Sequence, residues 1–202
     1  MRAIRWAAYA AIAVILAVWA VAWVRPGLIA SWSGHLDTAG AVSVGGPFQL
    51  TDNTGKPVTE ASYRGRFMLI YFGYTFCPDV CPTELQTIAS ALDQLGPEAA
   101  KIVPIFITVD PERDTVTALN DYVTLFDKRL VGLTGTQEQI GAVTRAYRVY
   151  YAKATSKGSS SYLMDHSSFL YLMGPDGGFR SLFRQGMSPD DLAKALRSRL
   201  AG

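Results

Sequence analysis

The sequence predicts an α/β domain with a central mixed sheet flanked by helices, preceded by one N-terminal transmembrane helix. Three observations predict this organisation: an apolar run at residues 6–24, an alternation of strand-like and helix-like stretches from Gly46 onward, and a length of 202 residues. That length allows one domain of ordinary size plus a short addition. We therefore expect an anchor at 1–25, a flexible linker at 26–45 and one folded domain at 46–202.

The apolar run is long enough to cross a membrane. Its 19 residues would form a helix roughly 28 Å long, close to the thickness of a bilayer core. Arg2 and Arg5 precede it and Arg25 follows, a slight bias that keeps the amino end in the cytoplasm. A cleaved signal peptide is the competing interpretation, because residues 20–22 offer a small-residue cleavage site, but the run is longer than usual for such a peptide. The run also lacks the character of an organelle transit peptide, so we predict a single pass through a bacterial inner membrane, with the soluble domain in the periplasm.

The composition excludes one large class of function. The chain has 19 Lys and Arg and 17 Asp and Glu, and three of the basic residues and one acid precede Gly46. The remainder is neutral, whereas a nucleic-acid-binding domain needs a basic excess for phosphate contacts. We therefore expect no nucleic-acid partner. Residues 26–45 mix Pro, Gly, Ser and Ala without a period and are typical of a tether.

The elements of the domain follow one another from Gly46. A hairpin signal surrounds the turn residues 52–55, and the apolar run 67–72 is typical of a strand buried on both faces. After a loop with two prolines, apolar residues recur at helical spacing from Cys81 until Gly96-Pro97 ends the helix. Then come a second buried strand at 102–109, a helix at 116–126, a helix that starts at a capping box, a strand hairpin around residues 174–177, and a last helix opened by Ser188-Pro189.

This order predicts one crossover between parallel strands followed by an antiparallel pair, which is the thioredoxin arrangement with an insertion. In such sheets, reactive groups collect where the first strand hands over to its helix. Cys77 and Cys81, the only cysteines, lie at that point.

The two cysteines permit more than one chemistry. Residues four apart face the same side of a helix, so both thiols can converge on one atom. Pro82 suits a first helical turn, which leaves Cys81 near a helix N-terminus that favours a thiolate. Metal binding and disulfide exchange both need a thiolate, so the pair alone does not decide between them. A purely structural disulfide is the weakest interpretation, since so short a loop gains little stability from a crosslink.

A third group would favour metal binding. Of the two histidines, His35 lies in the linker and His166 lies just before the strand predicted at 169–173. In a thioredoxin-like sheet, the loop that enters this strand lies beside the cysteine loop. Two thiolates and one imidazole form a soft site that favours Cu(I), tolerates Cu(II), and would accept Zn(II) if water filled a fourth position.

Five separated motifs resemble the SCO1/SenC family. They are residues 71–82 (YFGYTFCPDVCP), 110–115 (DPERDT), 131–135 (VGLTG), 146–151 (AYRVYY), and 165–167 (DHS) with 174–177 (GPDG). The resemblance runs from about Gly46 to the last helix. It implies a membrane-anchored copper metallochaperone that helps to build the binuclear copper centre of cytochrome c oxidase subunit II. Carried over by position, Cys77, Cys81 and His166 would be the copper ligands, binding Cu(I), Cu(II) or both.

Other functions stay open at this point. The main alternative is a thiol-disulfide reductase that keeps the cysteines of the copper target reduced. We expect a carrier and not an enzyme, with accessory thiol-disulfide oxidoreductase activity left open. A peroxidase is disfavoured because the loop lacks the usual spacing around its cysteine, and a copper-responsive sensor is a third interpretation. Other copper chaperones and thiol reductants are further candidate partners. Asp79 and Asp165 are expected to add negative charge or to orient His166, and residues 152–161 are expected to form a loop near this histidine.

Overall fold

The computed structural model describes residues 6, 44–155 and 162–201. The predicted anchor and linker therefore lie almost wholly outside the described residues. In the part of the chain that is described, no helix has both the length and the apolar character needed to cross a bilayer.

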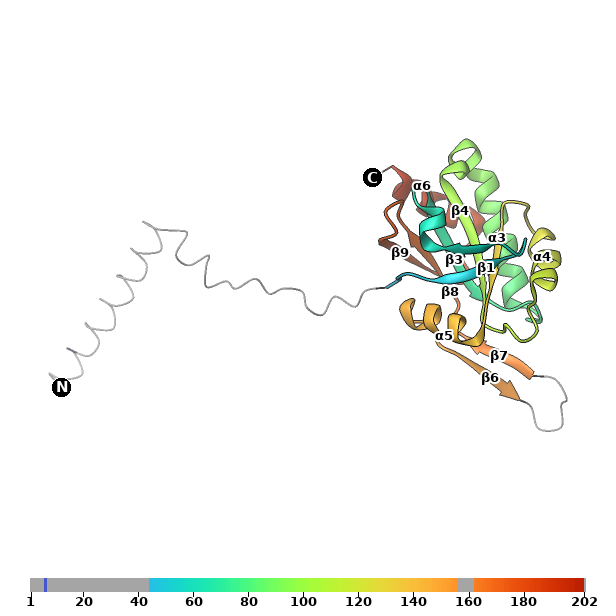
Figure 1. Cartoon of the computed structure of the whole chain (residues 1–202). Helices are drawn as coiled ribbons and strands as arrows, with labels where there is room; N and C mark the ends of the chain where they lie inside the picture. Colours follow the sequence, from blue (N-terminus) through green and yellow to red (C-terminus); the bar gives the residue numbers. More distant parts are fainter. Residues whose placement is uncertain (1–5, 7–43, 156–161, 202) are drawn as a thin grey trace. The chain divides into compact units, whose positions relative to one another are not determined.

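One mixed sheet forms the centre of the domain, as predicted (Figure 1). Within the described residues its strand order is β2-β1-β5-β4-β3-β8-β9. The strands are β1 Gln49–Asp52, β2 Pro57–Thr59, β3 Phe67–Gly73, β4 Ile102–Thr108, β5 Val131–Thr134, β8 Phe169–Met173 and β9 Phe179–Arg184. β3 pairs with β4 in parallel and with β8 antiparallel, so it lies in the interior of the sheet, which explains its continuous apolar sequence.

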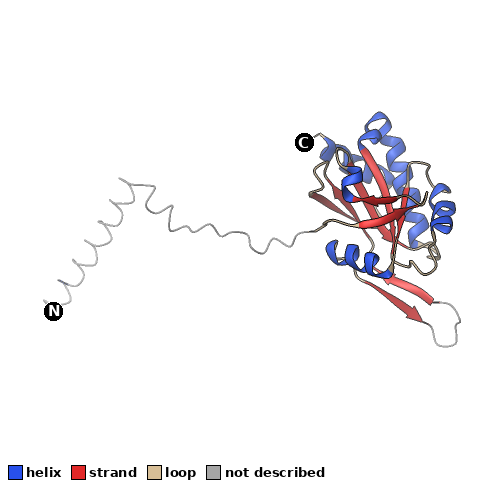
Figure 2. Cartoon of the chain, in the orientation of Figure 1, coloured by secondary structure: helices blue, strands red, loops and turns tan. Residues whose placement is uncertain are grey.

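Helices cover both faces of the sheet (Figure 2). They are α3 Val80–Leu95, α4 Val116–Thr124, α5 Gln137–Ala146 and α6 Pro189–Leu200, with short 3-10 helices at Glu60–Tyr63 and Gly96–Lys101. Three of them begin at a side-chain cap: the side chains of Thr115, Thr136 and Ser188 each accept a hydrogen bond from a backbone amide of the first turn. The capping box at Thr136 and the start at Ser188-Pro189 are as predicted.

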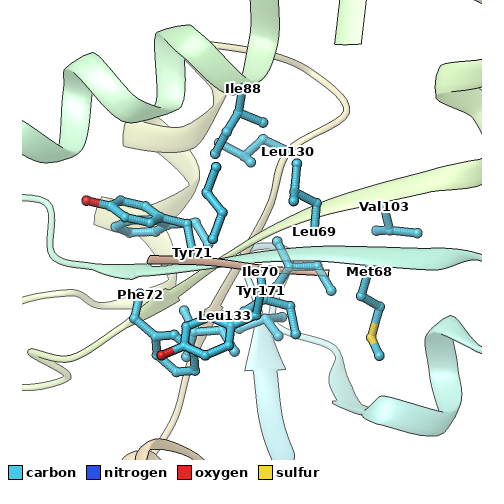
Figure 3. Packing of buried hydrophobic residues seen from close by; sticks show 14 of the residues in the cluster. Met68, Leu69, Ile70, Tyr71, Phe72, Ile88, Val103, Leu130, Leu133 and Tyr171 are labelled. Carbon is cyan, nitrogen blue, oxygen red and sulfur yellow. The ribbon is translucent and has the colours of Figure 1, made fainter. Parts of the chain in front are cut away.

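The alternation of β3 divides the core between the two faces. Tyr71 contacts Phe106 and the sulfur of Cys81 in α3, whereas Phe72 contacts Tyr147 at the end of α5. Figure 3 shows Tyr71 on the side of Ile88, and Phe72 on the opposite side. Tyr71 and Phe72 are both fully buried, on opposite faces of the sheet, so a shift of β3 by one residue would exchange their environments. The end of β3, where the cysteine loop begins, is therefore fixed in position.

Two features of the sheet were not predicted. β5 adds a second parallel crossover through α4, and it also pairs antiparallel with β1, which brings the first hairpin into the sheet. The strand is short and carries Gly132, where a Cβ atom would lie 2.7 Å from Leu119 of α4. Gly132 weakens the strand pattern in the sequence, but it is required because α4 packs closely against β5 at this position.

The expectation of a loop at 152–161 was wrong for the part that is described. β6 (Tyr151–Thr155) and β7 (Tyr162–His166) form a separate antiparallel hairpin, in which Tyr151 pairs with His166. The hairpin lies beside α5, whose Gln137 side chain donates a hydrogen bond to the Tyr151 hydroxyl (Figure 1). Its ladder of backbone hydrogen bonds makes this segment a strand despite its polar composition.

Candidate metal centre

The cysteine loop connects the end of β3 to the start of α3. Cys81 is the second residue of α3 and is fully buried, whereas Cys77 precedes the helix and is half-buried. Both are free thiols in this structure. The prediction that Cys81 lies in the first turn of a helix is confirmed.

The amino end of helix α3 points at Cys77. The backbone amide of Cys81 donates to Cys77 Sγ at 3.4 Å, and the Cys77 amide donates to the Tyr74 carbonyl at 3.3 Å. The hydroxyl of Tyr71 donates to Cys81 Sγ at 3.8 Å. Cys77 therefore sits where the free amides of a helix N-terminus stabilise negative charge.

His166 ends β7 and reaches the same point. Its Nε2 atom lies 3.6 Å from Cys81 Sγ, although the two residues are 85 positions apart. Its Nδ1 atom lies 3.2 Å from the carbonyl oxygen of Ser167. Because a carbonyl can only accept, the neutral ring carries its proton on Nδ1 and turns the lone pair of Nε2 toward the sulfur.

Two tyrosines shape the surroundings of the imidazole. The rings of Tyr71 and Tyr74 meet it edge-on, with centroid distances of 6.2 and 5.9 Å. A cavity of about 260 Å³ opens between the cysteine loop and β7, and both Cys77 and His166 line it. The site is thus walled by aromatic rings on its inner side and is accessible at Cys77.

The two thiols are electrostatically unlike. A hydrogen bond from Cys81 lowers the pKa of the Cys77 thiol to about 3, and hydrogen bonds from the backbone amides of Cys81 and Asp79 act in the same direction. The same contact with Cys77, followed by burial, raises the pKa of the Cys81 thiol. The sequence interpretation placed the favoured thiolate at Cys81, which is wrong here, because the helix amides face Cys77 while Cys81 is buried against Tyr71.

The three residues singled out from the sequence are therefore brought together. In the described residues, no three His, Cys, Asp or Glu side chains already stand in an arrangement that would hold a metal ion. Cys81 instead contacts both other residues, Cys77 through its backbone amide and His166 through its sulfur. His35 lies outside the described residues. Asp79 and Asp165 line the cavity, but the described ring contact of His166 is the Ser167 carbonyl, so no orienting bond from either carboxylate is found.

The sequence interpretation missed the buried residue that holds the cysteine loop. Asp114 precedes Thr115, whose side chain caps α4. The Asp114 carboxylate instead accepts from the Thr75 amide at 3.1 Å, from the Thr75 hydroxyl at 2.6 Å and from the Thr108 hydroxyl at 2.5 Å. Because Asp114 joins Thr75 and Thr108, which are far apart in sequence, no local pattern indicates that it holds the cysteine loop.

Comparison with known proteins gives the same picture. A family model described as SCO1/SenC matches residues 36–201. The human (Homo sapiens) protein named SCO1 homolog, mitochondrial, is 43% identical over 159 residues, which are 78% of this chain and 53% of the human protein. The Arabidopsis thaliana protein SCO1 homolog 1, mitochondrial, is 46% identical over 160 residues, which are 79% of this chain and 48% of the plant protein. The chain thus spans about half the length of these relatives.

Solved structures of related proteins have the same fold. The crystal structure of Arabidopsis thaliana ScoI with copper bound superposes with a TM-score of 0.75 at 42% identity, covering 79% of this chain and 99% of that one. The structure of Bradyrhizobium japonicum ScoI with copper bound superposes with a TM-score of 0.72 at 46% identity, covering 78% and 99%. The α/β, thioredoxin-like fold with a central mixed sheet is confirmed, and the chain belongs to the SCO1/SenC family.

Proposed function

We propose that this chain is a copper metallochaperone that binds one copper ion through Cys77, Cys81 and His166. It delivers this ion to the binuclear copper centre of cytochrome c oxidase subunit II. The observation that carries the proposal is the position of the His166 Nε2 atom, 3.6 Å from Cys81 Sγ. His166 ends β7, a strand separate from the cysteine loop, and the Nε2 atom of its imidazole faces the sulfur of Cys81. The copper-bound structures of relatives support copper as the cargo.

The spacing of the donors suits a shared ion. Using zinc distances as a guide, sulfur and nitrogen ligands lie about 2.3 and about 2.0 Å from a metal, so two of them on one ion are about 3.5–3.8 Å apart. The Cys81–His166 spacing of 3.6 Å falls in this range. Two sulfurs and one imidazole suit Cu(I), and Cys77, whose sulfur accepts from the Cys81 amide, would supply the third donor.

Delivery would follow from the unequal exposure of the ligands. The half-buried Cys77 is the ligand that an incoming donor group of the acceptor can replace first, whereas Cys81 is fully buried. Loading depends on the thiol state, because oxidation of Cys77 and Cys81 to a disulfide removes both sulfur donors. In that exchange the Cys77 thiolate attacks an acceptor disulfide and Cys81 gives up its proton, so the Cys77–Cys81 bond forms as the acceptor's S–S bond breaks into one thiolate and one thiol.

Titration of the reduced full chain with Cu(I) tests the ligand assignment. We expect about one copper per chain, near-complete loss of binding in Cys77→Ala and Cys81→Ala, and weakened retention in His166→Ala. His35→Ala is the matched control and should bind as the parent does. If Cys77→Ala bound Cu(I) like the parent, the ligand assignment would be wrong.

Transfer tests the delivery step. Mixing the copper-loaded chain with the copper-free soluble domain of subunit II should move copper to subunit II and produce the absorption of its binuclear centre. Retention of copper by the chain under conditions in which subunit II binds free copper would refute delivery to this target.

A second function is favoured by the asymmetry of the thiols. An accessible thiol with a pKa of about 3, beside a buried thiol of raised pKa, is the arrangement of an attacking and a resolving cysteine. The chain would then reduce the disulfide of the copper target. A disulfide-reduction assay on His166→Ala separates the two functions, since a reductase keeps its rate without the imidazole and a chaperone loses copper.

We also propose that residues 6–24 anchor the chain in a bacterial inner membrane, with the linker 26–45 and the domain 46–202 in the periplasm. The support is the apolar sequence of this segment and the arginines on either side of it. Alkaline phosphatase fused to the carboxyl end should be active and should sediment with membranes. An inactive fusion would contradict the orientation, and an active fusion in the soluble fraction would contradict the anchor.

A further inference from the structure

One loop contacts both halves of the metal centre. Residues 110–114, here called the bridging loop, lie between β4 and α4 and belong to the motif at 110–115. The cysteines follow β3 and the histidine ends β7, so neither comes from this loop. Its side chains nevertheless reach toward both.

Arg113 holds the strand that carries the histidine. Its guanidinium carbon lies 3.8 Å from the ring centroid of Tyr162, the first residue of β7, and its Nη1 atom donates to the Tyr162 carbonyl at 3.0 Å. Asp110 is 1% exposed, pairs with the Arg113 guanidinium and accepts from the Tyr162 hydroxyl at 2.8 Å. Lys153 of β6 adds a second cation, 4.6 Å from the same ring.

The same loop holds the cysteine side. The guanidinium of Arg113 also lies 4.7 Å from the ring centroid of Phe76, the residue before Cys77. Its neighbour Asp114 fixes the backbone and the hydroxyl of Thr75, two residues before Cys77. Adjacent residues of one loop thus bind the two segments that carry the candidate ligands.

We propose that the bridging loop sets the distance between the imidazole of His166 and the cysteine sulfurs, with Arg113 as the positioning residue for the histidine. The copper-affinity test of this inference rests on the proposed function. The contacts from which it is argued are those of the metal-free chain. In the part of the chain that the structure describes, the hairpin β6–β7 forms a sheet of its own, so side-chain contacts such as these help to fix the position of β7.

The chemistry of arginine suits this role. A planar guanidinium can stack on rings while its five N–H groups bond a carboxylate and a carbonyl at fixed angles. A lysine keeps the charge but not this geometry. Arg113→Lys therefore removes the positioning while it leaves a cation beside Asp110, and Tyr162→Phe removes only the hydroxyl that bonds Asp110.

Copper affinity in a double-mutant cycle tests the inference. In the full reduced chain, Arg113→Lys should weaken Cu(I) retention about 10–100-fold, the range typical for groups that orient a ligand, and Tyr162→Phe should weaken it in the same direction but less. In the His166→Ala background, Arg113→Lys should add less than about 2-fold, because the residue it positions is gone. Arg129→Lys, which alters a surface arginine paired with Asp93 and Asp127, is the control and should bind as the parent does.

Two copper results would overturn the inference. One is an equal loss of affinity from Arg113→Lys with and without His166, which would indicate a merely structural role. The other is parent-like affinity in both Arg113→Lys and Tyr162→Phe. If Arg113→Lys does not fold, Tyr162→Phe in both backgrounds carries the same test.

A metal-free readout separates this failure from failure of the proposed function. In the copper-free chain, NMR should detect NOE contacts between the ring protons of His166 and those of Tyr71 and Tyr74, and Arg113→Lys should weaken them. Unchanged contacts in Arg113→Lys and in Tyr162→Phe would overturn the positioning role whether or not the chain binds copper. If His166→Ala bound copper like the parent while these contacts depended on Arg113, the proposed ligand set would fail and the positioning role would stand.

Discussion

Gly73 offers a sharp test of how tightly the site is built. It is the last residue of β3, and a Cβ atom at this position would lie 2.7 Å from a ring carbon of Phe106 and 2.9 Å from Cys81 Sγ. Both neighbours are fully buried, and neither contact is with the tip of a flexible side chain. Gly73→Ala therefore drives a methyl group into the wall of the candidate metal centre.

The magnitude follows from these contacts. Overfilling a packed core costs about 1–3 kcal/mol, and replacing glycine with alanine in a strand returns about 0.4–1 kcal/mol through the unfolded state. We expect a net loss of about 1–2 kcal/mol in the free energy of unfolding, which for a domain of this size lowers Tm by about 3–6 °C. To restore an ordinary contact at 3.4 Å, the sulfur must move by about 0.5 Å, so Cu(I) affinity should also fall.

Thermal unfolding followed by circular dichroism, together with Cu(I) titration, measures both effects. Gly46→Ala is the matched control, since the nearest atom to its new Cβ would be Ala146 Cβ at 3.5 Å. This control should change stability by less than about 0.5 kcal/mol. A Gly73→Ala chain with the Tm and the copper affinity of the parent would refute the packing argument.

Two further predictions concern the supports and the thiols of the site. Asp114→Ala leaves the part-buried amide and hydroxyl of Thr75 and the buried hydroxyl of Thr108 without their acceptor, and it should cost about 3 kcal/mol in urea unfolding. Asp121→Ala, which alters an exposed residue of α4, should cost less than about 0.5 kcal/mol, and similar losses in the two variants would contradict this expectation. Because the Cys77 pKa is lowered to about 3 and that of Cys81 is raised, iodoacetamide at pH 6 should modify Cys77 first in the copper-free chain, as read by peptide mass spectrometry, and faster labelling of Cys81 would contradict this order.

The linkage between the thiols and stability has a definite sign. The pKa of Cys77 is lower in the folded chain than its ordinary value of 9.0, so its thiolate adds stability that is fully present above pH 9 and is lost as the pH falls toward 3. The raised pKa of Cys81 acts in the opposite direction above pH 9. Copper binding should likewise weaken in acid, where sulfur and imidazole donors become protonated.

The sequence was sufficient to predict those parts of the fold that leave a local pattern. The apolar run that becomes β3, the helical stripe of α3 and the capping box of α5 were all found where expected. β5 was missed because four residues with Gly132 among them carry little periodicity, and the strand exists through its pairing with β1 and β4. Such long-range pairing cannot be inferred from a local window.

The sequence was sufficient to name the candidate ligands but not to give their geometry. Cys77, Cys81 and His166 were named from the cysteine spacing and the family resemblance, and their role as ligands stays a prediction. The unequal pKa values of the two thiols depend on burial and on the direction of one helix amide. The contacts of Arg113 with Tyr162 join segments 49 positions apart, and no spacing rule connects them. Positioning of this kind is visible only once the sheet and the hairpin are built.

X-ray absorption on the copper-loaded, reduced full chain would count the sulfur and nitrogen atoms bound to the copper. We expect two sulfur donors and one nitrogen donor per copper in the parent, with the nitrogen lost in His166→Ala and retained in His35→Ala. A copper ion coordinated by sulfur alone in the parent, or an unchanged nitrogen signal in His166→Ala, would contradict it.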